Sequence, residues 1–131
     1  MIIVPAIYVN EPGCIPYARA ITLNIKPIET RSRDVLGHLV GQRVLIIRTR
    51  RNRKPLVIGS VKITGKSFKT AAELDALRDF TLITPGSMFD CKGRGKWCYE
   101  LSDGIAYEHP IPFAEYNVIH KTRSFAMVAM A

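Results

Sequence analysis

Between residues 43 and 63 the sequence reads RVLIIRTRRNRKPLVIGSVKI. The two ends of this stretch, 43–48 and 56–63, are runs of β-branched and aliphatic residues of strand length. The part between them is polar and ends in Pro55, as expected of a loop. The stretch therefore predicts a β-hairpin, and with it a fold built mainly on strands.

The connection between these two strands is strongly basic. The whole chain carries 19 Lys and Arg against 11 Asp and Glu, a formal net charge of +8, and such a charge favours a polyanionic partner. Cations gathered in one loop favour phosphate contact over plain solvation, which is the alternative. We therefore predict that the basic loop (residues 48–54) binds phosphates through five side chains: Arg48, Arg50, Arg51, Arg53 and Lys54.

Upstream of the hairpin, the pattern predicts a helix over about residues 15–23. Pro16 is tolerated in its first turn, where its missing N–H has no helical partner. Asn24 fits the left-handed position that closes many helices. The following stretch, 25–31, contains Pro27 and is therefore expected to be an edge strand or the beginning of a strand.

Downstream, Thr70 and Glu73 fit a capping box that opens a helix through about Phe80. A connection rich in Gly and cations follows over about residues 85–95. We expect it to be a mobile or ligand-contacting loop.

The C-terminal third indicates further strands. Residues 96–101 place Trp97, Tyr99 and Leu101 on one face of a strand. Asp103-Gly104 is a favoured two-residue hairpin turn, which would lead to a partner strand over about 105–108. A last strand is expected around 125–128.

Length and composition fit one domain over residues 1–131. The composition is 47% hydrophobic and 23% charged, which is ordinary for a globular protein. We predict a mainly β (α+β) fold with two short helices. The sequence has no apolar run long enough for a membrane span and no signal peptide at its start, so we expect a cytoplasmic protein with no membrane partner.

The three cysteines form an odd set without a Cys-x-x-Cys pair. This spacing argues against both a disulfide framework and a zinc site. We expect Cys14, Cys91 and Cys98 to be free thiols, and we expect no metal and no cofactor.

The segment after the first helix carries a recognisable motif. Pro16-Tyr17-Ala18 is followed by Asn24, Lys26, Glu29 and Arg31. This pattern resembles the ASCH family, whose hallmark is Gly-x-Lys-x-x-Glu-x-Arg after a helix that often opens Pro-Tyr-Ala. Only Asn24 departs from it, standing where the family has Gly. The resemblance covers about residues 1–115 and is also carried by 41–46 and 97–101.

The resemblance implies a PUA-like β-barrel with helices at its openings and a cleft where the Lys, Glu and Arg gather. The ASCH family is linked to RNA binding, and some small members are hydrolases of acylated cytidine nucleosides or of RNA. Our preferred hypothesis is a module that binds RNA, another single-stranded nucleic acid or a nucleotide. The alternative is an enzyme of the same fold. It would be either an amidohydrolase that acts on a modified nucleoside or a ribonuclease that acts on RNA. A third hypothesis is a domain whose basic loop binds an acidic protein.

Lys26 and Glu29 are the candidate catalytic residues, because a Lys can polarise a carbonyl and a Glu can activate water. The amidohydrolase members carry a Thr where Glu29 stands, so Glu29 would act here as a general base. Glu29 and Arg31 share a face of a strand, and Lys26 joins them only if the chain twists around Pro27. The alternative is a structural ion pair of Glu29 and Arg31 with Lys26 in solvent. Beside Pro27 on an edge segment, Lys26 and Glu29 are expected to contribute little to stability.

Aromatic residues are the remaining candidates. Trp97 and Tyr99 are predicted to contact a base, with Arg31 as a third nucleotide-binding residue. Tyr99 is the better candidate of the two aromatics because its hydroxyl needs a polar partner. The alternative for Trp97 is a packing role in the barrel core. Cations near Trp97 that could meet phosphates are Lys92, Arg94 and Lys96.

Overall fold

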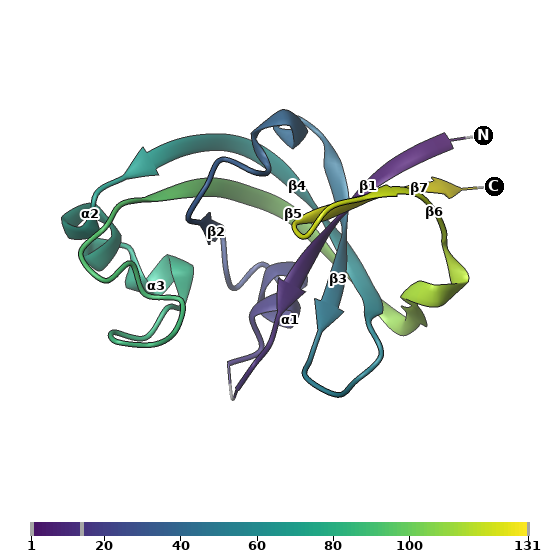
Figure 1. Ribbon diagram of the computed structural model, residues 1–131, viewed down its shortest axis with the longest axis horizontal. Helices are drawn as coiled ribbons and strands as arrows, with labels where there is room; N and C mark the ends of the chain where they lie inside the picture. Colours follow the sequence, from purple (N-terminus) through teal and green to yellow (C-terminus); the bar gives the residue numbers. More distant parts are fainter. Residues whose placement is uncertain (1, 14, 131) are drawn as a thin grey trace.

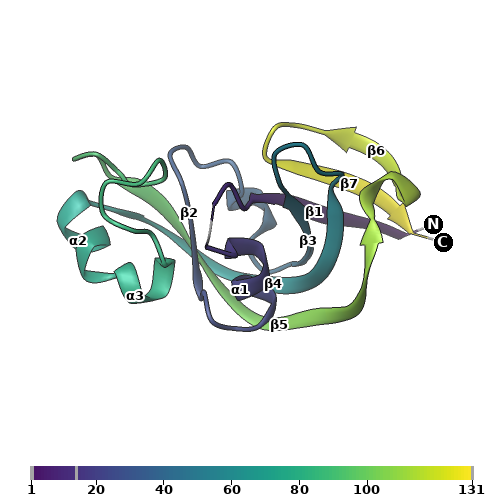
Figure 2. The same ribbon diagram turned by 90° about the horizontal axis from the view of Figure 1, so that it is seen from below.

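Seven strands form one strongly curled sheet in the computed structural model, which describes residues 2–13 and 15–130 (Figures 1 and 2). The strand order is β2-β5-β4-β3-β1-β7-β6. This curled sheet with a few short helices confirms the mainly β, PUA-like barrel that the sequence predicts. The strands are β1 (Ile2–Asn10), β2 (Ile28–Arg31), β3 (Arg43–Thr49), β4 (Leu56–Lys69), β5 (Lys96–Pro112), β6 (Asn117–Lys121) and β7 (Phe125–Met130).

The predicted hairpin is confirmed as β3 and β4, which pair antiparallel. β3 also pairs parallel with β1, which brings the beginning of the chain to the centre of the sheet. β2 lies at one edge of the sheet and pairs with β5, as expected of a segment that begins after Pro27. β6, at the other edge, was not predicted, because its residues are largely exposed and its sequence lacks a clear apolar alternation.

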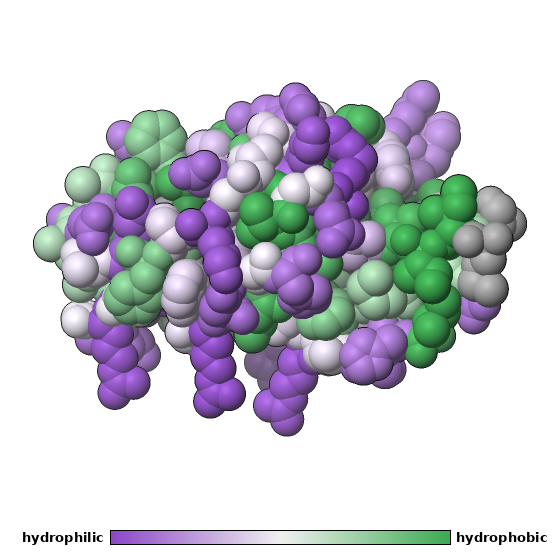
Figure 3. Space-filling model, turned by 90° about the horizontal axis from the view of Figure 1, so that it is seen from above, coloured by the Kyte–Doolittle hydropathy of each residue, from purple (hydrophilic) through white to green (hydrophobic). Residues whose placement is uncertain are grey.

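Apolar side chains cover both faces of the sheet. The larger cluster includes Ile7, Ile46 and Ile63 from three strands, with Ile21 from helix α1 (Tyr17–Thr22) packed against them. A smaller cluster lies on the other face around Leu45 and Val128. Viewed from above, the surface is hydrophobic at one end of the molecule, whereas hydrophilic side chains project from its middle (Figure 3).

The predicted capping box is present, but the helix that it opens is short. Thr70 Oγ accepts a hydrogen bond from Glu73 N at 3.2 Å, and Glu73 Oε1 accepts one from Thr70 N at 3.1 Å. The helix ends at Ala76 and a second one follows after Leu77, so the single helix expected through Phe80 is two short ones. These two helices are α2 (Ala71–Ala76) and α3 (Arg78–Thr81). Two 3-10 helices lie elsewhere in the chain, η1 (Gly37–Leu39) and η2 (Phe113–Glu115).

The hairpin turn predicted at Asp103-Gly104 is wrong. β5 runs through both residues, and Asp103 has φ of 54°. The pairing with β4 shifts between Ser60 and Lys62, which marks a bulge in place of a turn. The side-chain amide of Asn24 hydrogen-bonds to the backbone of Gly104. It donates to Gly104 O at 3.1 Å and accepts from Gly104 N at 2.7 Å. A side chain distant in sequence therefore keeps this segment in the sheet.

Within residues 2–13 and 15–130, no helix has the length and apolar character needed to cross a membrane.

Candidate functional site

The motif segment begins with a tight turn after α1. Asn24 has φ of 62°, the left-handed conformation that the sequence predicts for it. The N–H groups of Ile25 and Lys26 both donate to Ala20 O, at 2.8 and 3.1 Å. These bonds fold the chain back under the helix and direct the side chain of Lys26 inward.

Lys26 is buried, with only 2% of its surface exposed. Its Nζ donates to Thr81 O, lies 3.7 Å from Glu29 Oε1 and sits 5.2 Å from the centre of the Tyr17 ring. The twist around Pro27 that the motif requires is therefore present. The expectation that Lys26 and Glu29 lie on an exposed edge and contribute little to stability rested on a wrong premise, because a segment distant in sequence covers the pair.

Glu29 joins Lys26 to Arg31. Its Oε1 accepts a hydrogen bond from Thr30 N at 3.1 Å, and its Oε2 accepts one from Arg31 Nη2 at 3.1 Å. Arg31 Nη2 also donates to Tyr8 O at 2.7 Å, so the guanidinium bridges β2 and β1. The arrangement is a chain of three charges in which Arg31 is the most exposed member.

Burial and charge set the pKa values of this pair. Burial lowers the pKa of Lys26 below its ordinary value, although the nearby Glu29 carboxylate opposes the shift. For Glu29, burial would raise the pKa. The cations of Arg31 and Lys26, with the hydrogen bonds from Arg31 and Thr30, outweigh burial and leave the pKa below its ordinary value. Glu29 is therefore held as a carboxylate between two cations.

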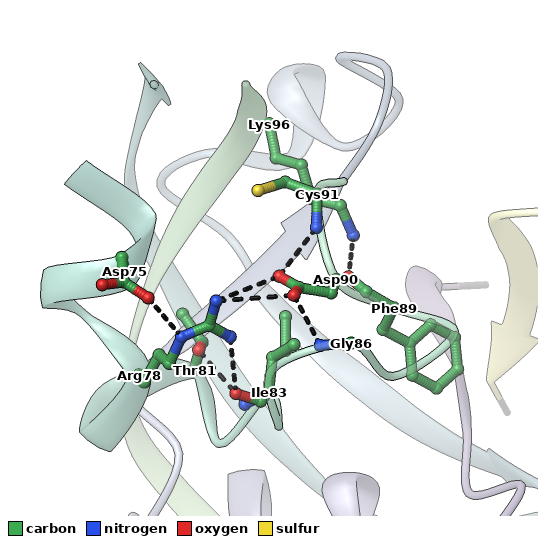
Figure 4. A network of polar contacts seen from close by, with 9 residues as sticks. All are labelled: Asp75, Arg78, Thr81, Ile83, Gly86, Phe89, Asp90, Cys91 and Lys96. Carbon is green, nitrogen blue, oxygen red and sulfur yellow. Dashed lines mark hydrogen bonds and ion pairs between the residues drawn. The ribbon is translucent and has the colours of Figure 1, made fainter. Parts of the chain in front are cut away.

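The segment that covers Lys26 consists of α2, α3 and the loop after them; we call it the covering segment (residues 71–95). Arg78 holds it together (Figure 4). Its Nε donates to Asp75 Oδ1 at 2.7 Å, its Nη1 to Ile83 O at 3.1 Å and its Nη2 to Asp90 Oδ1 at 3.3 Å. This network ties the short helices to the loop as one unit.

Three contacts fix the covering segment to the barrel. Lys26 Nζ donates to Thr81 O, Lys96 Nζ donates to Phe89 O, and the Phe89 ring packs edge-on against Tyr17 at 5.6 Å. The cavity bordered by Thr81 and Lys96 has a volume of about 10 Å³, room for at most one water molecule, and neither Lys26 nor Glu29 lines it. Lys26 and Glu29 lie together, 3.7 Å apart, but both are buried and not in an open cleft.

The basic loop is anchored by a buried carboxylate that the sequence did not single out. Glu11 Oε1 lies 3.0 Å from Arg50 Nη2 and 3.9 Å from Arg48 Nε, and Glu11 Oε2 accepts a hydrogen bond from Arg19 N at 3.1 Å. A lone Glu before a Pro gives no pattern from which this role could be deduced. Of the five cations predicted to bind phosphates, Arg48 lies in β3, and both Arg48 and Arg50 are paired with Glu11. Arg50 remains exposed despite this pairing, and Arg51, Arg53 and Lys54 are exposed at the tip.

β1 links Arg31 to the base of the basic loop. Arg31 is bonded to Tyr8 O in β1, and Glu11, which pairs with Arg48 and Arg50, follows three residues later, about 10 Å along an extended chain. The motif and the base of the basic loop are therefore both tied to the last residues of β1.

Tyr99, predicted to contact a base, is fully buried, so such a contact would require the residues that cover it to move. Its side chain is 0% exposed, because residues 34–36 cover it. The hydroxyl donates to Asp34 Oδ1 at 2.7 Å and accepts from Leu36 N at 3.2 Å. Burial is the main reason that its pKa rises to about 12. The polar partner that the hydroxyl needs is therefore within the protein.

Trp97 is only partly buried, at the margin of the larger core cluster. Its ring lies 5.6 Å from that of Phe68 in an edge-on arrangement, and Lys66 Nζ lies 5.4 Å from its centre. Trp97 is therefore neither a central core residue nor fully exposed. Phe68 was not predicted from the sequence, because it is the only apolar residue in the stretch 64–69, which has no β-branched run and no regular alternation.

No family model matches the sequence, and no curated protein matches it. Solved structures do. An ASCH protein from Zymomonas mobilis matches with a TM-score of 0.67 and 20% identity over 84% of this chain and 75% of that one. A serine-to-alanine variant of the Zymomonas mobilis protein gives 0.66 and 22% over the same shares. A tyrosine-to-phenylalanine variant gives 0.59 and 18%, covering 84% and 77%. The chain therefore has an ASCH-like fold.

Proposed function

We propose that this protein binds single-stranded RNA on the face formed by the basic loop and Arg31. The observation that carries the proposal is the position of Glu11. The Glu11 carboxylate fixes Arg48 and Arg50 beside the end of β1. The carbonyl of Tyr8 in the same strand accepts a hydrogen bond from Arg31 of β2. A cationic loop with a fixed base can follow a phosphate backbone, and a fixed guanidinium beside it can receive one nucleotide.

Each cation has a distinct part in this proposal. The three exposed cations at the tip are available to phosphates because Glu11 engages the other two. Both hydrogen bonds of Arg31 to the described part of the chain use Nη2, which leaves Nη1 and Nε to a ligand. Lys26 and Glu29 then act through Arg31, as positioning residues that fix the guanidinium.

The test is the salt dependence of RNA binding, measured by fluorescence anisotropy with a labelled 12-nucleotide oligouridylate. Each phosphate contact on a single strand contributes about 0.7 to the slope of log K against log salt concentration. Replacing the tip cations together, Arg51→Gln, Arg53→Gln and Lys54→Gln, should therefore reduce the slope by about 2.

A matched control removes the same charge elsewhere, through Arg43→Gln, Lys62→Gln and Lys121→Gln, all at exposed positions. This control should leave the slope within about 0.5 of the unsubstituted value, because Arg43 and Lys62 lie at the end of the β3–β4 hairpin opposite the basic loop and Lys121 lies in the edge strand β6. An equal loss of slope in both triple variants would mean that only net charge matters. In that case the basic loop is not the phosphate site.

Hydrolysis of an acylated cytidine or of RNA is the second candidate function, and the lowered pKa of buried Lys26 favours it. A Lys with a depressed pKa suits proton transfer or contact with a carbonyl. Because the pair is closed off, this function requires the covering segment to open. Release of free cytidine from an acylated cytidine, abolished by Lys26→Arg, would support it, because a guanidinium keeps the charge but does not lose its proton. An activity that survives Lys26→Arg would exclude proton transfer by Lys26.

A further inference from the structure

A row of three side chains crosses the sheet next to the motif. Arg31 in β2 is paired with Trp97 in β5, and Trp97 is paired with Phe68 in β4. Residues directly opposite each other in an antiparallel sheet lie on the same face. Arg31, Trp97 and Phe68 therefore follow one another across three adjacent strands.

Phe68 is held in an exposed position. Its surface is 53% exposed, and its ring packs edge-on against Trp97. A Cβ at Gly95 would lie 2.4 Å from Phe68 Cζ, so only a glycine there leaves room for the ring. The Phe68 ring therefore packs against Trp97 and Gly95, while about half of its surface stays open to solvent.

The charges around this pair favour a nucleic acid as its partner. Lys66 Nζ lies 5.4 Å from the Trp97 ring centre and 2.6 Å from Asp34 Oδ2, and Lys69 Nζ lies 3.9 Å from Glu73 Oε2. These two carboxylates are each matched by a Lys, so the local positive excess comes from Lys92 and Arg94, which are exposed just before β5. Exposed aromatic rings among cations are the usual means by which proteins hold unpaired bases.

We propose that Trp97 and Phe68 form a stacking platform for a base of the RNA strand whose neighbouring nucleotide lies at Arg31. This inference rests on the proposed RNA binding and makes it more specific. A platform beside Arg31, in addition to the basic loop, requires a ligand of several nucleotides. The ligand class is therefore an oligonucleotide, and a free nucleoside fills only part of the surface.

Trp97 is the only tryptophan of the sequence, so its fluorescence reports directly on the platform. Titration with the 12-nucleotide oligouridylate should quench this fluorescence, whereas uridine monophosphate at the same nucleotide concentration should not. Phe68→Ala should weaken oligonucleotide binding by about tenfold, within the range of one lost base stack. Phe68→Tyr keeps a ring and should restore binding. The matched control is Phe80→Ala, at a phenylalanine that is 48% exposed but lies on α3.

The possible results separate this inference from the proposed function. Salt-dependent RNA binding with unchanged Trp97 fluorescence and an unaffected Phe68→Ala variant would overturn the platform and leave the proposed function intact. A different result is that the variant without the three tip cations keeps both the fluorescence quenching and the salt slope of the unsubstituted protein. That result would overturn the phosphate site and keep the platform. A decaglutamate peptide serves as a second probe. Binding of this peptide without binding of RNA would overturn both in favour of an acidic protein partner.

Discussion

Replacement of Lys26 should destabilise the protein far more than replacement of an exposed lysine. Lys26→Ala removes a donor from the buried carbonyl of Thr81, takes one cation from Glu29 and leaves a cavity beneath the covering segment. Breaking a buried ion pair by removing one partner typically costs about 3–5 kcal/mol. For a chain of this length that loss corresponds to a melting temperature lower by about 10–20 °C. Lys26→Met should cost less, because it keeps much of the apolar volume and Glu29 retains Arg31.

Urea unfolding and differential scanning calorimetry measure this effect, with Lys62→Ala as the control. Lys62 is an exposed lysine in β4, and surface substitutions of this kind change stability by about 0.5 kcal/mol or less. RNA binding by Lys26→Met should be measured in parallel, at a temperature where the variant is folded. If Lys26→Ala and Lys62→Ala melt within about 2 °C of each other, the contacts of Lys26 contribute nothing net to stability. The reasoning from its burial would then be wrong.

Two further predictions concern ionisation and thiols. The pKa of Glu29 is lower in the folded protein than in the unfolded chain. The ionised carboxylate therefore contributes its full stabilisation at pH values above the pKa of the unfolded chain, about 4.3. That contribution is lost as the pH falls through the pKa of the folded protein. The urea midpoint should therefore drop on acidification, less steeply in Glu29→Gln, and equal slopes in the two proteins would contradict this. Thiol titration of the unfolded protein should count three free cysteines, and a count of one would reveal a disulfide. In the native protein Cys98 should react slowly, because it is buried and burial raises its pKa; Cys91 is partly exposed, and Cys14 lies outside the described residues.

The parts of the fold that the sequence predicted are those with local causes. The β3–β4 hairpin follows from two aliphatic runs on either side of a polar loop. The capping box at Thr70 and the left-handed turn at Asn24 each depend on a few neighbouring residues. Even the pairing of Glu29 with Arg31 follows from a spacing of two on a strand. Such features are encoded within one turn or one strand, so a single sequence suffices to predict them.

The parts that failed depend on contacts between distant residues. Asp103-Gly104 has the composition of a turn, but the Asn24 side chain, 80 residues away from Gly104, bonds to it and β5 continues. Glu11 became the anchor of the basic loop only through the packing of α1 against the end of β1. Lys26 is buried under α3, where the carbonyl of Thr81, 55 residues away, accepts a hydrogen bond from its ammonium group. None of these partners could be identified without the tertiary structure.

The covering segment weighs against hydrolysis and in favour of binding on the open face. Opening it breaks two hydrogen bonds from lysine ammonium groups, to Thr81 O and Phe89 O, each worth about 1.5–3 kcal/mol. It also separates Phe89 from Tyr17, at a cost of about 0.5–1.5 kcal/mol. An opening cost of about 4–7 kcal/mol would reduce the apparent affinity of any ligand that needs the open state by about 10³–10⁵. A free nucleoside offers too few contacts to offset such a loss, whereas an oligonucleotide can bind Arg31, the platform and the basic loop without opening the segment at all.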